Sequence, residues 1–183
     1  MSTLKVNSII PVAGVPTGGG GGIIQIKQTV KTDTFSQTTV SCNTFSNDCG
    51  LNVSITPTSS SSKIYIMGTA NMSGSDATSG HAIGLFKDGS VLSSATGDAN
   101  GNRTRVMHQT WNETSYTGLI TSVPFQFLDS PATTSSITYG IRLMILASAS
   151  TSHIYLNRSK DISDNQAYKG MTISVITAME VSA

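Results

Sequence analysis

Apolar and polar residues alternate along several short runs of this chain, a period of two that is typical of β-strands. The clearest case is 51–56, where Leu51, Val53 and Ile55 alternate with polar residues. Residues 171–178 alternate as well, but apolar side chains occur at both sets of positions, so this strand has two apolar faces. Clusters of turn-forming residues separate the runs. We predict strands over 23–30, 35–40, 51–56, 63–70, 81–87, 91–95, 103–111, 117–128, 136–147, 152–158 and 170–181.

No segment sustains the 3.6-residue period of an amphipathic helix with caps. Strands that follow one another with only turns between them favour an antiparallel architecture. Asp88-Gly89 marks one hairpin, because this pair accepts the positive φ angles of a tight turn. The Gly- and Ser-rich stretch 72–80 is predicted to be a surface loop. The fold class expected is all-β: an antiparallel, jelly-roll-like β-sandwich with an extended N-terminal leader.

The first 22 residues differ from the rest of the chain. Apolar residues are followed by Pro11, Pro16 and the glycine run 18–22, which has the composition of a flexible spacer. One interpretation is a disordered terminus, and the other is a docking peptide that buries its apolar side chains against another protein. Docking is favoured, because a purely disordered leader has little use for Leu4, Val6, Ile9 and Ile10. We divide the chain into an anchoring peptide with its linker, 1–22, and a sandwich domain, 23–183.

Composition narrows the classes of partner. Ser and Thr together make 52 of the 183 residues, whereas charged residues make only 11% and the net charge is +1. Nucleic-acid binding needs a basic surface, which this chain lacks. No run reaches the roughly 18 to 20 apolar residues of a membrane span, and the N-terminus lacks the features of a signal peptide. Few charges and many hydroxyls suit subunits that pack closely, so we expect a homo-oligomer.

The two cysteines, Cys42 and Cys49, flank a turn-like segment and could face each other across a hairpin. A disulfide requires an oxidising compartment, which the missing signal peptide argues against. A free, half-buried pair is therefore preferred over a bridge.

The sequence offers little catalytic chemistry. His81, His108 and His153 lie on separate predicted strands without metal-ligand spacing, and most Asp residues fall in predicted turns, where they accept backbone N–H bonds. We expect no metal, no cofactor and no enzymatic activity, with a polysaccharide hydrolase as the least favoured alternative.

One cluster is suited to recognition. Arginine, the single tryptophan and a tyrosine crowd into a short stretch as Arg103, Arg105, Trp111 and Tyr116. Arg, Trp and Tyr are favoured at binding hot spots, so we treat these four as candidate receptor or subunit contacts. The alternative is that Trp111 is a core residue.

The residues also carry a resemblance to a known group. The opening residues Met1 to Ile9 resemble the start of small virion structural and tail-fibre-type proteins from marine bacteriophages that infect cyanobacteria. The body is similar to the same proteins at 59–64, 97–103, 127–134 and 155–159. The resemblance implies an N-terminal peptide that anchors to the particle and a β-rich head, commonly trimeric, that faces outward. The short leader leaves no room for a long shaft, which favours a compact knob or adaptor.

Three hypotheses follow for the function. The first is a trimeric virion protein of the tail, a fibre, knob or adaptor subunit that binds other virion proteins through residues 1–17 and contacts the host surface. It would assemble in the host cytoplasm, bind no nucleic acid and insert into no membrane. A capsid-decoration (head fibre or cement) protein is the second possibility, because it too needs an anchor and a β head. The third is a carbohydrate-binding module that uses Trp111 or Tyr116 for host glycans.

Overall fold

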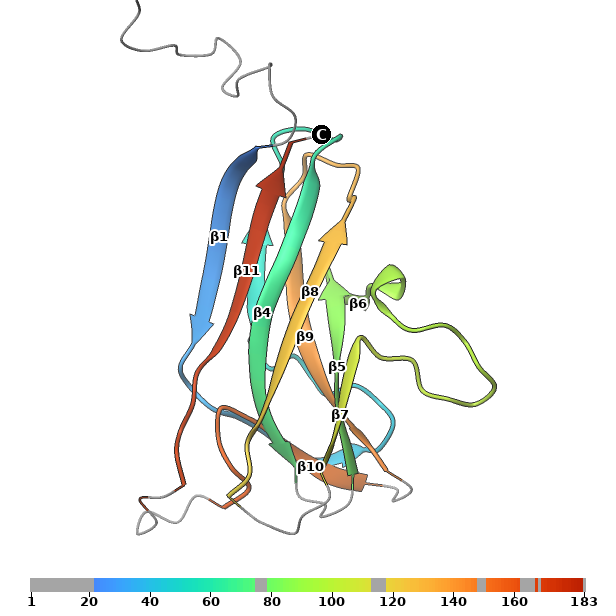
Figure 1. Ribbon diagram of the computed structural model, residues 1–183, viewed down its shortest axis with the longest axis vertical. Helices are drawn as coiled ribbons and strands as arrows, with labels where there is room; N and C mark the ends of the chain where they lie inside the picture. The colour runs from blue at the N-terminus through green and yellow to red at the C-terminus, as the bar shows by residue number, and fades with distance from the viewer. Residues whose placement is uncertain are drawn as a thin grey trace, which may run out of the picture.

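In a computed structural model, residues 22–74, 79–112, 118–147, 151–161, 167 and 169–182 are described. These residues form eleven β-strands and one 3₁₀ turn (η1, Ser93–Ala95), and none of them lies in an α-helix. The strands make two antiparallel sheets packed face to face (Figure 1). The predicted all-β antiparallel sandwich is confirmed. None of the described segments forms a helix with the length and hydropathy of a membrane span.

Sheet A is built around its longest strand, β4. One edge of β4 pairs with β11 and, further along, with β10, while the other edge pairs with β8. β1 extends the sheet beyond β11, and β2 extends it beyond β10. The six strands are β1 (Ile23–Lys31), β2 (Phe35–Ser41), β4 (Lys63–Gly74), β8 (Thr121–Asp129), β10 (Thr151–Leu156) and β11 (Ser174–Val181).

Sheet B is built around β5 and β9, which pair along eight residues. β3 pairs with the outer edge of β9, and β6 and β7 pair with the outer edge of β5. The five strands are β3 (Asn52–Ile55), β5 (Ser79–Lys87), β6 (Ser90–Val91), β7 (His108–Asn112) and β9 (Ile137–Leu146).

The strand order identifies the kind of sandwich. Through the middle of the molecule the sheets read β1–β11–β4–β8 and β3–β9–β5–β7. Strands that are consecutive in the sequence thus cross repeatedly from one sheet to the other, as in the two Greek keys of a jelly roll. The core lies between the sheets, where fully buried Ile64 and Ile66 from β4 and Ile83 and Leu85 from β5 belong to one apolar cluster.

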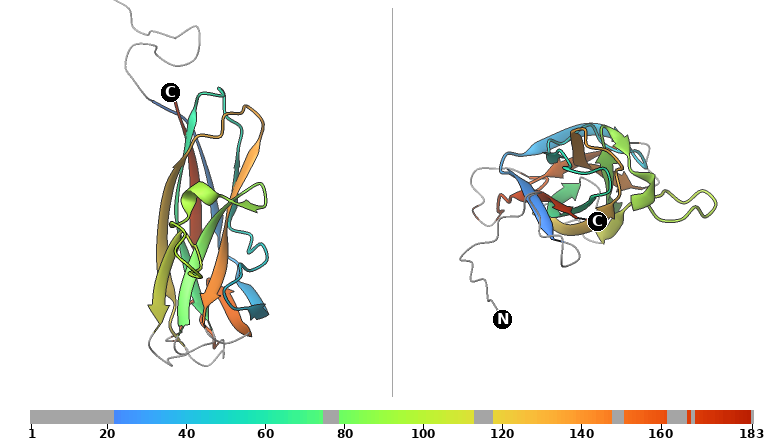
Figure 2. Two further views of the ribbon diagram at one scale, coloured as in Figure 1. Left: turned by 90° about the vertical axis from the view of Figure 1, so that its right-hand side faces the viewer. Right: turned by 90° about the horizontal axis from the view of Figure 1, so that it is seen from above.

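The two ends of the sandwich differ. At one end the first described residue, Gly22, hydrogen-bonds Ser182 in both directions, with its N–H donating to Oγ at 3.0 Å and its carbonyl accepting from N–H at 2.9 Å. The chain therefore enters and leaves the domain at the same end (Figures 1 and 2). β4, β7 and β9 all finish at the opposite end, called here the distal end.

Three local predictions need correction. Of the predicted strand 91–95, only Val91 is extended, as the second residue of β6, because η1 follows it. Only 108–111 of the predicted strand 103–111 is extended; 103–107 belong to a loop that projects from the sandwich (Figure 1). The predicted loop 72–80 is strand in its described parts, since β4 continues to Gly74 and β5 begins at Ser79; residues 75–78 lie outside the described residues. By contrast, the predicted hairpin is present, with φ of +49° at Asp88 and +79° at Gly89.

Candidate interaction surfaces

The candidate site residues from the sequence do not form one described site. The anchoring residues Leu4, Val6, Ile9 and Ile10, and the candidate contact Tyr116, lie outside the described residues. Arg103 and Arg105 are exposed in the projecting loop, where Arg105 Nε donates to the Gly97 carbonyl at 2.6 Å and closes the loop at its neck. Within the described residues, no hydrogen bond or cation–π contact joins either arginine to Trp111.

Trp111 is on the surface rather than in the core. Its side chain is 53% exposed, and it lies on β7 directly opposite Gly80 of β5. A Cβ at Gly80 would be 3.3 Å from Trp111 Cε3, so the missing side chain provides the space in which one edge of the indole rests. The alternative of a core tryptophan is therefore wrong. The ring is displayed on the outer side of sheet B near the distal end.

The three histidines lie on different strands. His81 is buried between the sheets, His108 is exposed at the start of β7, and His153 belongs to β10. Among the described residues, no three His, Cys, Asp or Glu side chains gather as a metal site would require.

No disulfide joins Cys42 and Cys49, as predicted, and both are buried more deeply than the half-buried pair expected from the sequence. The thiol of Cys49 donates to the Ile141 carbonyl, and burial raises its pKa to about 11. The hairpin that could have placed the two cysteines opposite each other does not form, because residues 43–49 run along β9 instead.

The outer side of sheet B is covered by this same segment. Asn43 N–H donates to the Ile145 carbonyl at 2.8 Å, and Ser46 N–H donates to the Leu143 carbonyl at 2.7 Å. These bonds place Phe45 over the sheet, where it packs edge-on against Phe86 with ring centroids 5.1 Å apart. Two outward-facing side chains next to this cover are almost inaccessible: Met144 and Phe86 are 2% and 9% exposed.

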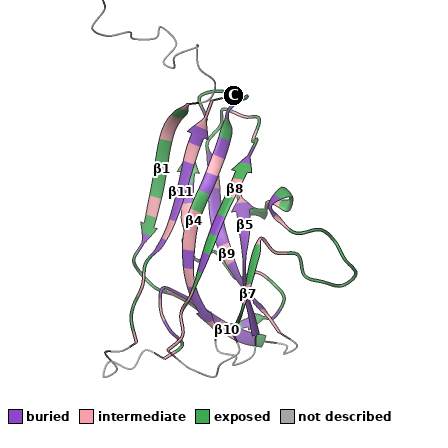
Figure 3. Ribbon diagram, viewed as in Figure 1, coloured by how far each residue is buried: buried purple, intermediate pink, exposed green. Residues whose placement is uncertain are grey.

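Among the described residues, no comparable segment covers the outer side of sheet A. The register across β1, β11, β4 and β8 places large apolar side chains in rows that face away from the core. Several are well exposed, including Ile26 at 56%, Val30 at 48%, Met67 at 39% and Leu128 at 48% (Figure 3). The outer face of sheet A is formed by Ile26, Gln28, Val30, Val175, Thr177, Met179, Val181, Lys63, Tyr65, Met67, Thr69, Pro124, Gln126 and Leu128.

A groove borders this face on its β8 side. It has a volume of about 780 Å³ and lies between β8, the outer side of β4, and the wall formed by residues 94–97 with Met107 and His108. Its lining mixes apolar side chains such as Met67 and Phe127 with Thr69, Gln126 and His108. Pro124 in β8 is typical of an edge strand, because proline cannot donate to a neighbouring strand. The groove therefore extends the exposed face toward an open sheet edge.

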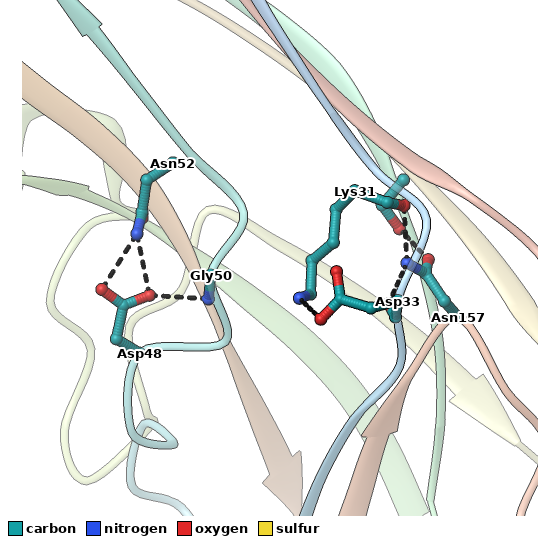
Figure 4. A network of polar contacts seen from close by, with 7 residues as sticks. Lys31, Asp33, Asp48, Gly50, Asn52 and Asn157 are labelled. Atoms are coloured by element: carbon teal, nitrogen blue, oxygen red, sulfur yellow. Dashed lines mark hydrogen bonds and ion pairs between the residues drawn. The ribbon is translucent and has the colours of Figure 1, made fainter.

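Figure 4 shows two sets of polar contacts, the first of which fixes the end of the segment that covers sheet B. Asp48 accepts from the Gly50 N–H at 2.8 Å and from the Asn52 amide at 2.9 and 3.0 Å, which fixes the turn into β3. The nearly buried Lys31 donates to Asp33 at 2.6 Å, and this bond lowers the pKa of Asp33.

Asn157 ties several strands together. Its buried amide donates to the carbonyls of Lys31 and Asp33, and its Oδ1 accepts from Ser174 Oγ at 2.6 Å. These bonds satisfy a side chain that is 0% exposed, so the network is part of the fold rather than a binding site.

Two buried carboxylates lie near the end where the chain enters. Asp129 is one of the Asp residues that the sequence places in turns as acceptors of backbone N–H bonds. It instead ends β8, where it accepts from Tyr139 Oη at 2.6 Å and from Lys87 Nζ at 2.9 Å. Burial, followed by the bond to Asp129, raises the pKa of Tyr139 far above its ordinary value. Burial alone would raise the pKa of Glu180, but hydrogen bonds from Gln25, Thr58 and Ser62 outweigh it and lower that pKa. Both carboxylates are fully engaged in structural bonds.

Comparison with known proteins adds a distant structural likeness. No protein-family model matches the sequence, and no curated protein matches it either. One solved structure, that of T=1 particles derived from infectious bursal virus, aligns with 86% of this chain at 13% identity and a TM-score of 0.36. This chain spans 39% of the length of that one.

Proposed function

We propose that this protein is a structural subunit of a bacteriophage virion that acts by assembly and not by catalysis. The observation that carries the proposal is that sheet A has large apolar side chains on its outer face as well as in the core, and that no described part of the chain covers them. A domain that works alone buries one face of each sheet and solvates the other, so a second apolar face is suited to other subunits. The jelly-roll strand order supports the proposal, because viral capsid domains commonly use this fold. The resemblance of the sequence to phage structural proteins supports it as well.

Within the virion, we propose a tail position as a fibre, knob or adaptor subunit. Residues 1–17 would bind other virion proteins through Leu4, Val6, Ile9 and Ile10. Gly22 lies beside Ser182 at one end of the domain, so an anchor attached there leaves the distal end free to face the host. Assembly would take place in the host cytoplasm.

Immunogold labelling of purified particles tests this function. An antibody against residues 23–183 should label intact virions at one fixed position, and the position separates a tail subunit from a capsid-decoration protein. If the antibody detects the protein only in the unassembled fraction of an infected culture, the virion role is wrong.

Substitutions in the leader test the anchor. Replacing Leu4, Val6, Ile9 and Ile10 by serine should abolish incorporation into particles, because it removes the apolar side chains and keeps the length of the peptide. The matched control replaces Lys5 and Asn7 by serine and should incorporate normally. Normal incorporation of the apolar-to-serine variant would place the anchor elsewhere.

A second candidate function is binding of a host glycan, and the exposure of Trp111 favours it. An indole that is 53% exposed near the distal end offers an apolar face of the kind on which sugar rings stack. Glycan-array binding by the full chain should disappear in Trp111→Ala and persist in Val91→Ala, another exposed apolar position. An array on which the unaltered protein binds nothing would leave only the structural role.

A further inference from the structure

The outer face of sheet A has an ordered pattern of side chains across its four strands. The pairings place Ile26, Met179, Tyr65 and Leu128 in one row, and Gln28, Thr177, Met67 and Gln126 in the next. A third row contains Val30, Val175, Thr69 and Pro124. In each row the two edge residues have the same chemical character: Ile26 with Leu128, Gln28 with Gln126, and Val30 with Pro124.

This symmetry of character matches the face to a second copy of itself. A two-fold axis that runs parallel to the strands, between β11 and β4, lays β1 of one copy over β8 of the other. Each row then meets its own counterpart, with apolar edges on apolar edges and amide on amide. Such an isologous arrangement requires a surface that is complementary to itself, and the three rows meet this requirement.

Charge and hydrogen bonding also allow the face to be buried. Its one charged side chain, Lys63, lies at the end of β4 and outside the three rows. Gln28 Nε2 donates to Thr177 Oγ1 at 2.9 Å, and Tyr65 Oη donates to Gln126 Oε1 at 2.6 Å. Because these polar groups already bond one another, covering them leaves few unpaired donors and acceptors.

The size of the face is compatible with a small dimer interface. Four strands at spacings of about 4.8 Å, over rows that span about 20 Å, give a footprint near 400 Å². The exposed side chains of Ile23 and Ile173 adjoin it and bring the apolar surface toward the roughly 800 Å² per partner of a standard stable interface.

We propose that two copies of this chain associate face to face through the outer face of sheet A, around a two-fold axis parallel to the strands. The inference rests on the proposed role as an assembling subunit and identifies the partner of its uncovered face. It replaces the trimer expected from the sequence with a dimer as the basic unit.

The oligomeric state of the full chain tests the proposal. Sedimentation should find a dimer, and Met67→Glu should raise the dissociation constant at least about 100-fold, because it buries an unpaired carboxylate at the centre of the interface. Ile26→Lys at the edge should weaken the dimer in the same direction while leaving the circular dichroism spectrum unchanged. The control Val91→Glu adds a charge at an exposed position outside the face and should remain dimeric.

The results that would overturn the proposal are distinct from those that test the virion role. A monomeric or trimeric wild-type protein, or a dimer that Met67→Glu leaves intact or Val91→Glu dissociates, rules out the face-to-face pair. Particle labelling can still succeed in each of these cases, so a failure of the dimer does not imply a failure of the proposed function.

Cross-linking distinguishes the direction of the axis. Gln28→Cys and Gln126→Cys, prepared in separate chains and mixed, should be joined by a bis-maleimide that spans the roughly 10 Å between packed sheets. Gln28→Cys alone should not cross-link, because its counterpart on the partner is Gln126. The native thiols are buried and serve as the unreactive background. Efficient cross-linking of Gln28→Cys to itself would indicate a different axis and overturn the proposed arrangement.

Discussion

The outer faces of the two sheets differ in how much of their apolar surface is exposed. On sheet B, Met144 is 2% exposed because Phe45 and its neighbours lie over the strands. On sheet A, Ile26 and Leu128 are 56% and 48% exposed, and no part of the described chain covers them. A jelly roll needs only one buried face per sheet. Whether the outer face of each sheet is covered or exposed therefore indicates how the protein assembles, which the fold alone does not.

Glycine explains where the chain can cover itself. Gly84 and Gly140 face outward on sheet B, and a Cβ there would lie 2.5 Å from the Phe45 ring and 2.0 Å from Asn52 Oδ1. The missing side chain of Gly84 makes room for Phe45 of the covering segment, and that of Gly140 makes room for Asn52 of β3. The outward positions in the three rows of sheet A contain no glycine, so that surface is filled by its own side chains and offers a broad contact instead of such spaces.

We expect the largest loss of stability when Phe45, the aromatic side chain over sheet B, is removed. Phe45→Ala should lower the free energy of unfolding by about 3 kcal/mol, since it removes an aromatic side chain packed on Phe86 and exposes the sheet below. Urea denaturation followed by circular dichroism measures the loss. A change below about 0.5 kcal/mol would mean that sheet B does not depend on its cover.

The buried side of sheet A should contribute to stability, and a substitution at Glu180 tests this. Glu180→Gln should lower the free energy of unfolding by about 2 kcal/mol at neutral pH, because hydrogen bonds to a charged carboxylate are lost. The pKa of Glu180 is lowered in the folded protein, so this stabilisation is present above the unfolded pKa and disappears as the pH falls through the folded one. The difference between variant and wild type should therefore vanish in acid. A difference that persists unchanged in acid would exclude the charge as its cause.

Adding a side chain at Gly84, beneath Phe45, should lower the unfolding free energy by a smaller amount. Gly84→Ala places a Cβ 2.5 Å from the ring and should cost about 1 to 2 kcal/mol through displacement of the cover. Combining it with Phe45→Ala should recover most of that cost, since the clash then has no partner. Additive effects in this double-mutant cycle would place the strain elsewhere.

The smallest change in unfolding free energy should come from a substitution on the outer face of sheet A. Ile26→Gln should change the unfolding free energy of the monomer, measured at dilution below the dimer dissociation constant, by less than about 0.5 kcal/mol. A loss comparable to that of Phe45→Ala would show that the outer face of sheet A contributes to folding and would remove the contrast between the sheets.

The sequence predicts the strands with clear alternation and misses those whose surroundings are long-range. Leu51, Val53 and Ile55 all point inward as expected, and the two apolar faces of the last strand correspond to the core and the outer face of sheet A. The predicted strands 91–95 and 103–111 fail over 92–95 and 103–107, because local alternation does not reveal that the chain leaves the sandwich there.

The candidate sites are less accessible to sequence reasoning. Nothing near Phe45 indicates that it covers Gly84, because the contact depends on hydrogen bonds to β9 about 100 residues away. The position of Trp111 is equally hidden, since its indole rests in the space left by Gly80 on the neighbouring strand. Asp129 looks like a turn residue until the fold brings Lys87 and Tyr139 to it.

The closed neck of the projecting loop has a practical consequence for engineering. Gly97 N–H donates to the Val106 carbonyl, and Arg105 donates back to the Gly97 carbonyl, so the base of the loop is fastened independently of its tip. Lengthening a surface loop costs only about 0.6 kcal/mol for each doubling. A peptide epitope inserted beside Gly101 would therefore be displayed away from the sandwich, clear of the uncovered face and of the end from which the leader departs.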